Sequence, residues 1–600
     1  MKQRFSIPHI IDRAKATVLR FPLAILVALV ATILGIVVLH QENIEDYINV
    51  FLTLSFALPL AIGGVLFAEV RKLKPLDRGV TISVAVAFLL VYYSLLPEIG
   101  RAHDDLYIRH AMWAFGFVLL ITFIPFIFQK SKEGVIRFWQ YNRGLIFTWI
   151  LTGIWVGALM AGISIALGSI DFLFDINIDE KRYAEIWMIL NGVFAPMFFL
   201  NRLPNKPVAL DTSRPFPKEV RLFSQFVLVP LVSAYFLILY AYTIRIVLTS
   251  EWPEGQLAYM IIGFSFLGVL TYLALHPLRE KLAWVRHAGT VLFAAMIPQV
   301  GMLFWALWFR VSEYGITENR YFVALFGLWL LGIAIFFLVR KQKDIRIIPV
   351  SLFVLAVLSS FGPWGAFFVS EWSQVDRLEG ILIQNELLVD GKYQKPEGEL
   401  NRDDQVEISS IVRYLGQRHG FDAIESWFDA PFKIEDLDRW EITKKVLDEH
   451  FGLEEYYPSY RSSYEPNYNE QQFLYIYTDQ FKADLVDISS SEYFGNVSLH
   501  QDNEFTAGED IIRFDVQSSE MKINVFKNGH VIDSVSLQPL VNLAQDQVNN
   551  RGSVSMSEAT MRHSSPVIDL TLVSESFGLT KDSDSSRVNS IDAWVFFALK

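Results

Sequence analysis

Three ionisable side chains, Glu313, Glu318 and Arg320, stand between two long apolar runs in the segment SEYGITENRYF, residues 312–322. A carboxylate and a guanidinium this close in sequence can form a two-donor ion pair or hold a polar ligand. The run TVLFAAMIPQVGMLFWALWF precedes the segment and FVALFGLWLLGIAIFFLV follows it. Whether the segment is a hydrated loop or a site therefore depends on what else reaches that end of the apolar runs.

Polar side chains also occur at three other places next to the apolar runs: the end of the seventh run, the loop after it, and the segment after the eleventh run. The candidate site residues are Arg245, Glu251, Trp252, Glu254, Glu318, Asn319, Arg320, Arg377 and Glu379. Two interpretations stay open: a ring of interfacial ion pairs and tryptophan anchors that docks a soluble domain, or a ligand site. If the ring docks a domain, we expect Arg320 to pair with Glu251, Glu254, Glu318, Glu371 or Glu379, because a poorly hydrated arginine favours a planar carboxylate contact.

The centres of the apolar runs contain no Asp, Glu, Lys, Arg or His. Ionisable groups at mid-membrane mark proton relays and ion-coupled carriers, so this pattern argues against a proton-driven pump. The polar side chains that remain there are Asn191, Gln225 and Gln299, which we interpret as hydrogen-bonding partners between helices. The acid pair Asp104–Asp105 could serve an enzyme with a lipid-linked substrate, but a solvated loop is the favoured interpretation.

The sequence predicts no cofactor and no metal site. The chain has no cysteine, its 11 histidines lack metal-ligand spacing, and the motifs HExxH, GxxxxGK[ST] and GxSxG do not occur. The net charge of −12 is uneven, with basic residues in short loops and the acidic excess in the last third. That distribution argues against nucleic acid as a partner.

Eleven apolar stretches approach or exceed the roughly 20 residues that a helix needs to cross about 30 Å of hydrocarbon. We place them at residues 21–40, 49–70, 80–97, 111–128, 145–167, 186–200, 222–248, 257–275, 290–309, 322–339 and 347–369. The sixth contains Asn191, Gly192 and Pro196, so we expect it to be short and irregular.

The loops between these stretches alternate in basic content. From the amino end, the odd-numbered polar segments hold 5, 4, 4, 5, 3 and 4 Lys and Arg, and the intervening ones hold 0, 2, 2, 0 and 2. Short cytoplasmic loops collect Lys and Arg. The alternation predicts a cytoplasmic amino terminus and, after eleven crossings, a carboxyl end on the outer face.

The composition changes near residue 371 to a charged, Tyr-rich soluble domain. We divide the chain into a basic amphipathic cytoplasmic segment (1–20), a transmembrane domain (21–370), and a periplasmic domain with a mainly helical part (371–465) and a β-rich part (466–600). Asn528-Gly529 predicts a two-residue hairpin turn in which both residues have positive φ. The stretch 456–477 could stack sugars or peptides, although packing is the favoured interpretation of its tyrosines.

Several of these segments carry a family resemblance. VLVPLVSAYFLILYAY, EWPEGQLAYMIIGFSFLGVLTYLALHPLRE, GITENRYFVALFGLWLLG, SQVDRLEGIL and DGKY resemble the bacterial inner-membrane family catalogued as domain of unknown function four-one-five-three. The likeness is good over about residues 222–420 and loose in the amino-terminal half. It implies a multi-pass inner-membrane protein of a bacterium with two membranes, and it implies no chemistry.

The predicted fold class is an α-helical polytopic membrane domain followed by a soluble α+β domain. The favoured function is non-catalytic: an envelope protein for binding, sensing or assembly, with the lipid bilayer and a periplasmic protein, peptide or glycan as partners. The alternatives are a transporter or flippase for a lipid or amphiphile, and a membrane enzyme acting on a lipid-linked substrate. A mid-membrane cavity would favour the transporter, and a pocket lined by outer carboxylates would favour the enzyme.

Overall fold

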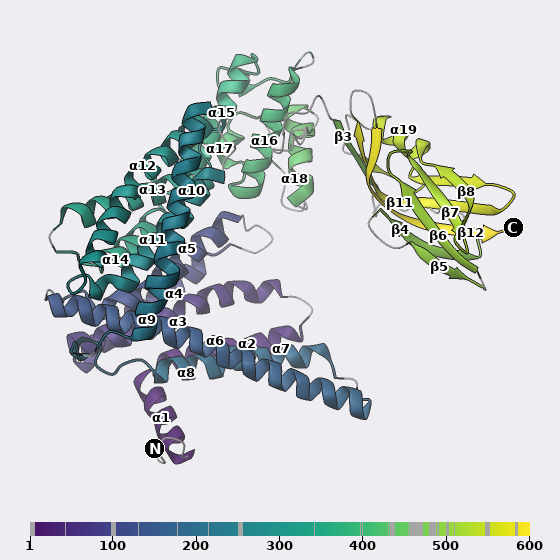
Figure 1. Cartoon of the computed structure of the whole chain (residues 1–600). Helices are drawn as coiled ribbons and strands as arrows, with labels where there is room; N and C mark the ends of the chain where they lie inside the picture. Colours follow the sequence, from purple (N-terminus) through teal and green to yellow (C-terminus); the bar gives the residue numbers. More distant parts are fainter. Residues whose placement is uncertain are drawn as a thin grey trace. The chain divides into compact units, whose positions relative to one another are not determined.

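The computed structural model describes residues 7–41, 44–97, 104–129, 131–176, 178–213, 215–249, 256–340, 342–396, 398, 400–429, 431–432, 439–453, 455, 472–478, 486, 488, 491–499, 503–508, 510–546, 552–581 and 586–600. The chain forms two compact units, Met1–Ser459 and Tyr460–Lys600, which are described separately. Figure 1 shows the first unit as a helical assembly and the second as a set of strands.

The first unit is built almost entirely from helices. They are α1 (Ile7–Arg20), α2 (Pro22–Leu39), α3 (Glu45–Arg71), α4 (Pro75–Leu95), α5 (Asp104–Phe123), α6 (Lys132–Phe174), α7 (Glu180–Ile189), α8 (Ala195–Asn201), α9 (Lys218–Phe223), α10 (Val229–Thr249), α11 (Gln256–Leu275), α12 (Ala283–Tyr314), α13 (Glu318–Val339), α14 (Ile347–Leu358), α15 (Ala366–Gln384), α16 (Arg402–Arg418), α17 (Asp422–Glu425) and α18 (Arg439–Val446). A two-residue ladder joins β1 (Leu388–Val389) to β2 (Lys392–Tyr393).

Ten helices in the described part of the chain are long and apolar enough to cross a membrane. They are Pro22–Leu39, Tyr47–Arg71, Pro75–Leu95, Asp104–Phe126, Lys132–Phe174, Glu180–Asn201, Lys218–Thr249, Leu257–Leu278, Ala283–Tyr314 and Glu318–Val339. Many of their large apolar side chains, such as Trp149, Leu237 and Val247, point away from the protein interior. That exposure fits lipid contact, since lipid solvates apolar side chains as well as a protein core does. Ten of the eleven predicted spans correspond to these helices.

The eleventh predicted span is interrupted. Helix α14 has only 12 residues, and the chain turns through residues 359–365, where Gly362 has a φ of 79°, before α15 begins. Two contacts show that the chain nevertheless runs back along α13. Trp329 donates to Ser351 Oγ (2.9 Å), and Tyr321 donates to the Trp364 carbonyl (2.7 Å). Helix α14 and the turn thus replace the expected continuous helix, since positive φ at Gly362 and a following proline break the helical ladder.

The sixth span is irregular, as the sequence predicts, but the expectation that it is short is wrong, because it runs over Glu180–Asn201, 22 residues. A π-helical turn, η3 (Leu190–Phe194), separates α7 from α8, and Pro196 lies in the first turn of α8. Gly192 lies directly against Thr32 of α2, where a Cβ atom would overlap the threonine hydroxyl. The glycine therefore allows close contact between the two helices at the π turn. A second π-helical turn, η5 (Ser224–Leu228), joins α9 to α10.

The amphipathic helix α1 is held at its carboxyl end by Arg20. This guanidinium makes a two-donor contact with Glu69 of α3, both bonds at 2.8 Å, and also donates to the carbonyls of Leu203 and Pro204 at 2.9 Å. Planar contacts of this kind are stronger than exposed ion pairs. Arg20 thereby ties three chain segments together at one end of the apolar helices.

The segment after α15 adds a small helical subdomain to the first unit. Its core joins α15, the β1–β2 ladder, α16, α17 and α18 through buried apolar side chains. They are Leu378, Ile381, Leu382, Leu387, Leu388, Ile408, Ile411, Val412, Leu415, Phe421, Ile424, Val446, Leu447, Phe451 and Leu453. Arg377 Nη2 on α15 lies 2.8 Å from Glu407 Oε1 on α16. The subdomain therefore has its own core, closed partly by α15.

In its described residues, the second unit contains two mainly antiparallel sheets and one helix. The strands are β3 (Gln472–Thr478), β4 (Tyr493–Ser498), β5 (Glu504–Ala507), β6 (Asp510–Gln517), β7 (Lys522–Lys527), β8 (His530–Ser536), β9 (Gly552–Val554), β10 (Thr560–Ser564), β11 (Ile568–Lys581) and β12 (Ser586–Leu599), and the helix is α19 (Gln538–Asp546). One sheet has the order β4-β12-β11-β3-β9, with β10 also paired to β11, and the other has the order β5-β6-β7-β8. The fold class predicted from the sequence is confirmed.

One hydrophobic core closes the second unit. Alternate residues of both sheets, such as Phe514 and Val525 on one and Phe577 and Phe597 on the other, are buried together with Leu540 of α19. Because successive side chains of a strand point to opposite faces, each sheet gives one face to this core and presents the other outward. The unit is therefore a β-sandwich.

The predicted hairpin turn is confirmed. Asn528 and Gly529 have φ of 52° and 84°, and Lys527 pairs with His530 across the turn. The Asn528 side chain accepts from the Ile511 amide (2.9 Å), which ties the turn to the neighbouring strand. Positive φ at both central residues matches the right-handed twist of the strands.

We predict that Gly529→Val destabilises the β7–β8 hairpin by roughly 1–3 kcal/mol. No neighbouring atom lies within 4 Å of a Cβ built at this glycine, so the effect comes from backbone strain alone. Hydrogen exchange of amides 522–536 in the full chain should accelerate about fivefold or more. Gly529→Asn, which tolerates positive φ, is the matched control, and equal exchange in all three proteins would contradict the prediction.

Candidate functional site

The strongest concentration of paired polar side chains lies at the end of the apolar helices where α12 ends and α13 begins. We call this region the junction; it comprises the start of α5, residues 312–322, the turn 359–365, α15, and residues 402–425 of α16 and α17. All of it belongs to the first unit. In Figure 1, α15 leads from the apolar helices to α16 and α17.

Glu318, the first residue of α13, is the buried centre of the junction. It is 6% exposed, Tyr414 of α16 donates to its Oε2 (2.7 Å), and His419 Nε2 lies 2.8 Å from its Oε1. Tyr414 and His419 also lie 3.2 Å apart through the hydroxyl and Nε2. The amino end of a helix favours a negative charge, and the hydrogen bond from Tyr414 and the nearby ring of His419 offset the burial of the carboxylate where water is excluded. Burial of the Tyr414 hydroxyl, together with the negative charge of Glu318, raises the pKa of Tyr414.

Among the described residues, Arg320 forms no ion pair with Glu318, Glu371 or Glu379, and the other acids predicted as its partners, Glu251 and Glu254, lie outside them. Its Nη1 donates to the carbonyls of Tyr314 (3.0 Å) and Gly315 (2.7 Å), at the carboxyl end of α12. The last carbonyls of a helix lack intrahelical donors, and a guanidinium supplies them. Among the described residues, Arg320 therefore donates to backbone carbonyls and not to an acid. Glu318, one of the acids expected to pair with it, contacts Tyr414 and His419 instead.

The loop between α12 and α13 is tied to α15. Gln374 of α15 donates from Nε2 to the carbonyls of Tyr314 (3.0 Å) and Ile316 (3.1 Å), and the Ile316 amide donates to Ser373 Oγ (2.9 Å). Gly315 has a φ of 66° directly beside Gln374. The segment that the sequence leaves open between loop and site therefore docks α15 and α16 on the apolar helices.

The acid pair Asp104–Asp105 lies in the first turn of α5 and not in a solvated loop. Arg109 donates from Nε to Asp105 Oδ2 (3.0 Å) and from Nη1 to the Ser360 carbonyl (2.8 Å). Arg418 Nη1, at the end of α16, lies 3.6 Å from Asp104 Oδ2. Both acids are therefore engaged by arginines, which adds α5 to the junction.

The other predicted junction residues are less central. Arg377 pairs with Glu407, and Asn319 donates to the hydroxyl of Tyr259. The side chains of Arg245 on α10 and Glu379 on α15 are exposed. Glu251, Trp252 and Glu254 lie outside the described residues, as do residues 456–471 of the Tyr-rich stretch.

The three polar side chains predicted inside the membrane are not brought together. Asn191 donates to the carbonyl of Trp187 in its own helix (2.9 Å), and Gln225 lies in the π-helical turn η5. Gln299 of α12 is 1% exposed; its Oε1 lies 3.5 Å from the Thr243 hydroxyl of α10, and its Nε2 has no partner among the described residues. Only Gln299 thus links two helices.

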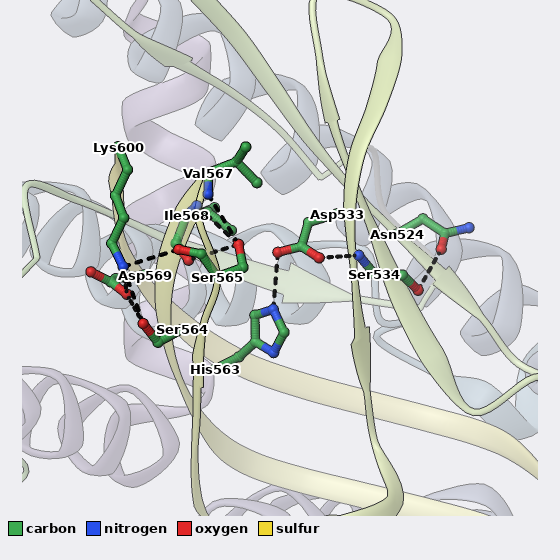
Figure 2. Close-up of polar contacts among 10 residues, drawn as sticks. All are labelled: Asn524, Asp533, Ser534, His563, Ser564, Ser565, Val567, Ile568, Asp569 and Lys600. Carbon is green, nitrogen blue, oxygen red and sulfur yellow. Dashed lines mark hydrogen bonds and ion pairs between the residues drawn. The ribbon is translucent and has the colours of Figure 1, made fainter.

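A second polar cluster lies in the β-sandwich and is structural (Figure 2). His563 of β10 lies 2.9 Å from Asp533 of β8, which joins the two sheets. Burial alone would raise the pKa of Asp533, but hydrogen bonds from Ser565 and His563 hold it below its usual value. Lys600 pairs with Asp569 (2.7 Å) and so fixes the last residue. Among the described residues, no group of three His, Asp or Glu side chains is arranged to hold a metal ion.

Sequence reasoning missed Tyr414, His419 and Arg109. Tyr414 and Glu318 are 96 residues apart in sequence, and no local pattern predicts such a contact. The available signal was indirect: Glu318 opens an apolar helix, so a buried carboxylate there requires a donor from another element.

The fold defines a multi-pass membrane protein that also carries a β-rich soluble unit. The chain belongs to the family described as Domain of unknown function (DUF4153), whose model matches residues 23–392. This range contains Glu318 and Arg109 and ends before α16, which supplies Tyr414.

The chain is similar to an uncharacterized protein of Pasteurella multocida (strain Pm70), with 25% identity over 435 residues. The match covers 71% of this chain and 66% of that protein, so the chain spans just under two thirds of its relative. No solved structure matches the chain.

We predict that Glu318→Ala loosens the packing of α16 against α13 by roughly 3–5 kcal/mol, because it leaves Tyr414 and His419 buried without their acceptor. Hydrogen exchange of amides 402–418 should rise more than tenfold in purified protein. Adding Tyr414→Phe and His419→Leu to a Glu318→Leu variant should restore part of the protection, since all three polar groups of the cluster are then removed together. Glu379→Gln, an exposed acid near the same region, is the control; equal exchange in Glu318→Ala and the control would refute the docking role.

Proposed function

We propose that this protein is a non-catalytic binding or assembly protein of the bacterial envelope, anchored in the inner membrane with a cytoplasmic amino terminus. Its periplasmic part comprises a mainly helical segment (371–465) and a β-rich segment (466–600). The alternation of Lys and Arg between successive loops supports this orientation. The paired side chains of the junction support a structural role for residues at the base of the periplasmic part.

The observation that carries the proposal is an aromatic row on the outward face of the six-stranded sheet. Phe494 of the edge strand β4 is 70% exposed and Trp594 of β12 is 38% exposed. Phe596 lies beside Phe494, with ring centroids 6.3 Å apart, and Trp594 donates from its indole to Glu575 Oε1 (2.6 Å). Exposed aromatic side chains of a soluble domain are typical of surfaces that bind a protein, peptide or glycan.

A membrane enzyme acting on a lipid-linked substrate is the second candidate. It is favoured by a cavity of about 410 Å³ at the junction, because Glu371 lines it. The carboxylates first considered for catalysis, Asp104 and Asp105, are paired with Arg418 and Arg109. Their engagement in ion pairs favours the binding protein over the enzyme.

The orientation is testable with a reporter that is active only in the periplasm. A fusion after Lys600 should be active, and a fusion within residues 340–346 should be silent, because that loop holds four basic residues. Immunoblots must show equal amounts of both fusions. Activity within residues 340–346, or a silent but abundant fusion at Lys600, would overturn the orientation.

The binding face is testable by photo-cross-linking in cells. A photoreactive amino acid at Phe494 should give a discrete adduct, and Trp594→Ala should reduce that adduct by about tenfold. Val531 is the matched control, because it is also exposed but lies on the other sheet. The same adducts from positions 494 and 531, or no effect of Trp594→Ala, would contradict a specific face.

A further inference from the structure

The cavity at the junction lies between α5, the turn 359–365 and α15. Its lining residues are Arg109, Ser360, Phe361, Gly362, Pro363, Gly365, Phe367, Phe368 and Glu371. Its volume of about 410 Å³ is within the range of small-ligand pockets, about 300–1,000 Å³. One basic and one acidic side chain, Arg109 and Glu371, thus share an otherwise largely apolar lining.

Arg109 is held in place with part of its guanidinium still available. Its Nε and Nη1 are engaged by Asp105 and the Ser360 carbonyl, and its Cζ lies 4.1 Å above the ring of Phe367. No bond of Nη2 to a described residue is present, and the side chain is 37% exposed. A guanidinium fixed in this way is suited to a phosphate oxygen.

Glu371 is half-buried and pairs with no cationic side chain among the described residues. Its carboxylate forms no hydrogen bond or ion pair with any described residue, whereas His419 is already 2.8 Å from Glu318. Burial raises the pKa of Glu371, and the nearby carboxylates of Asp105 and Asp422 raise it further, against the opposite effect of His419 and Arg109. An incoming ammonium group would compensate this excess of negative charge.

The surroundings of the cavity include exposed aromatic side chains. Phe361 and Phe368 line it, Trp364 lies in the same turn, and all three are exposed. Trp364 donates from its indole to the Leu358 carbonyl (3.0 Å), and Tyr321 donates to the Trp364 carbonyl (2.7 Å). Such half-apolar, half-polar aromatic groups are enriched at the depth of lipid headgroups. A ligand in this cavity can therefore have its polar part inside and its chains on the apolar helices.

We propose that this cavity binds the headgroup of a zwitterionic phospholipid, with the primary ammonium on Glu371 and the phosphate on Arg109. The two side chains match the two charges of phosphatidylethanolamine, and the exposed aromatic rim favours a lipid over a free headgroup. The site does not involve the aromatic row of the sandwich.

Native mass spectrometry of the delipidated full chain tests the proposal. The wild-type protein should retain phosphatidylethanolamine at least tenfold more strongly than phosphatidylglycerol, which lacks the ammonium. Glu371→Gln should abolish that preference while binding of phosphatidylglycerol stays unchanged. Glu379→Gln, an exposed acid on the same helix, should behave as wild type. Equal binding of both lipids by the wild type, or an unchanged preference in Glu371→Gln, would refute the site.

Two further measurements distinguish the source of the ligand and guard against misfolding. Soluble glycerophosphoethanolamine should compete at least a hundredfold less well than the lipid; equal competition would refute the lipid assignment. A photoactivatable phosphatidylethanolamine, applied to the wild-type protein, should label peptides spanning residues 359–372. Labelling confined to other helices would overturn the proposal even if Glu371→Gln failed to fold.

Discussion

The carboxylate of Glu318 lies at the first residue of an apolar helix, where neither bulk water nor lipid can solvate it. A buried charge needs polar partners beside it, and here Tyr414 donates to one oxygen and the ring of His419 lies 2.8 Å from the other. Both groups come from α16 and the residue after it, so the carboxylate at the start of α13 has these partners only when the helical subdomain is docked. The start of α13 and the docking of the helical subdomain therefore depend on the same contacts.

The same constraint explains why charge gathers at the two ends of the apolar helices. At the end opposite the junction, Arg20 joins α1, α3 and the loop after α8. Arg346 has a similar role, with Asp344 at 2.6 Å and the Phe126 carbonyl at 3.0 Å. In both places the guanidinium serves backbone carbonyls that lipid would leave without donors. Arginine is suited to this role because it offers five donors in a fixed plane.

The apolar helices and the Asn528-Gly529 turn could be predicted because their signals are local. Hydrophobic length defines a candidate span, and two residues define a tight turn. The contacts of Arg320 could not be predicted, because the sequence cannot show that the carbonyls of Tyr314 and Gly315 compete with nearby acids. The interruption at Gly362 was missed because the residues on both sides are apolar, so mean hydropathy runs through it.

The contacts within the candidate site are even harder to predict from the sequence. Glu318 was identified from the sequence, but its partners lie about 100 residues further along the chain, beyond any periodic pattern. The division of the soluble part at residue 465 stays a prediction, although the compact units separate between Ser459 and Tyr460. Burial and pairing are properties of the assembled chain, which is why types of residue were easier to predict than their contacts.

The π-helical turn η3 has an implication for how this family varies. A π turn accommodates one residue more than an α-helix over the same length, and each residue of an α-helix corresponds to a rotation of about 100°. Deleting one residue within Leu190–Phe194 would convert the turn to regular helix while leaving both flanking faces in phase. Related chains can therefore differ by a single-residue gap at this point without repacking α7 or α8, and such gaps would record where evolution gained or lost the turn.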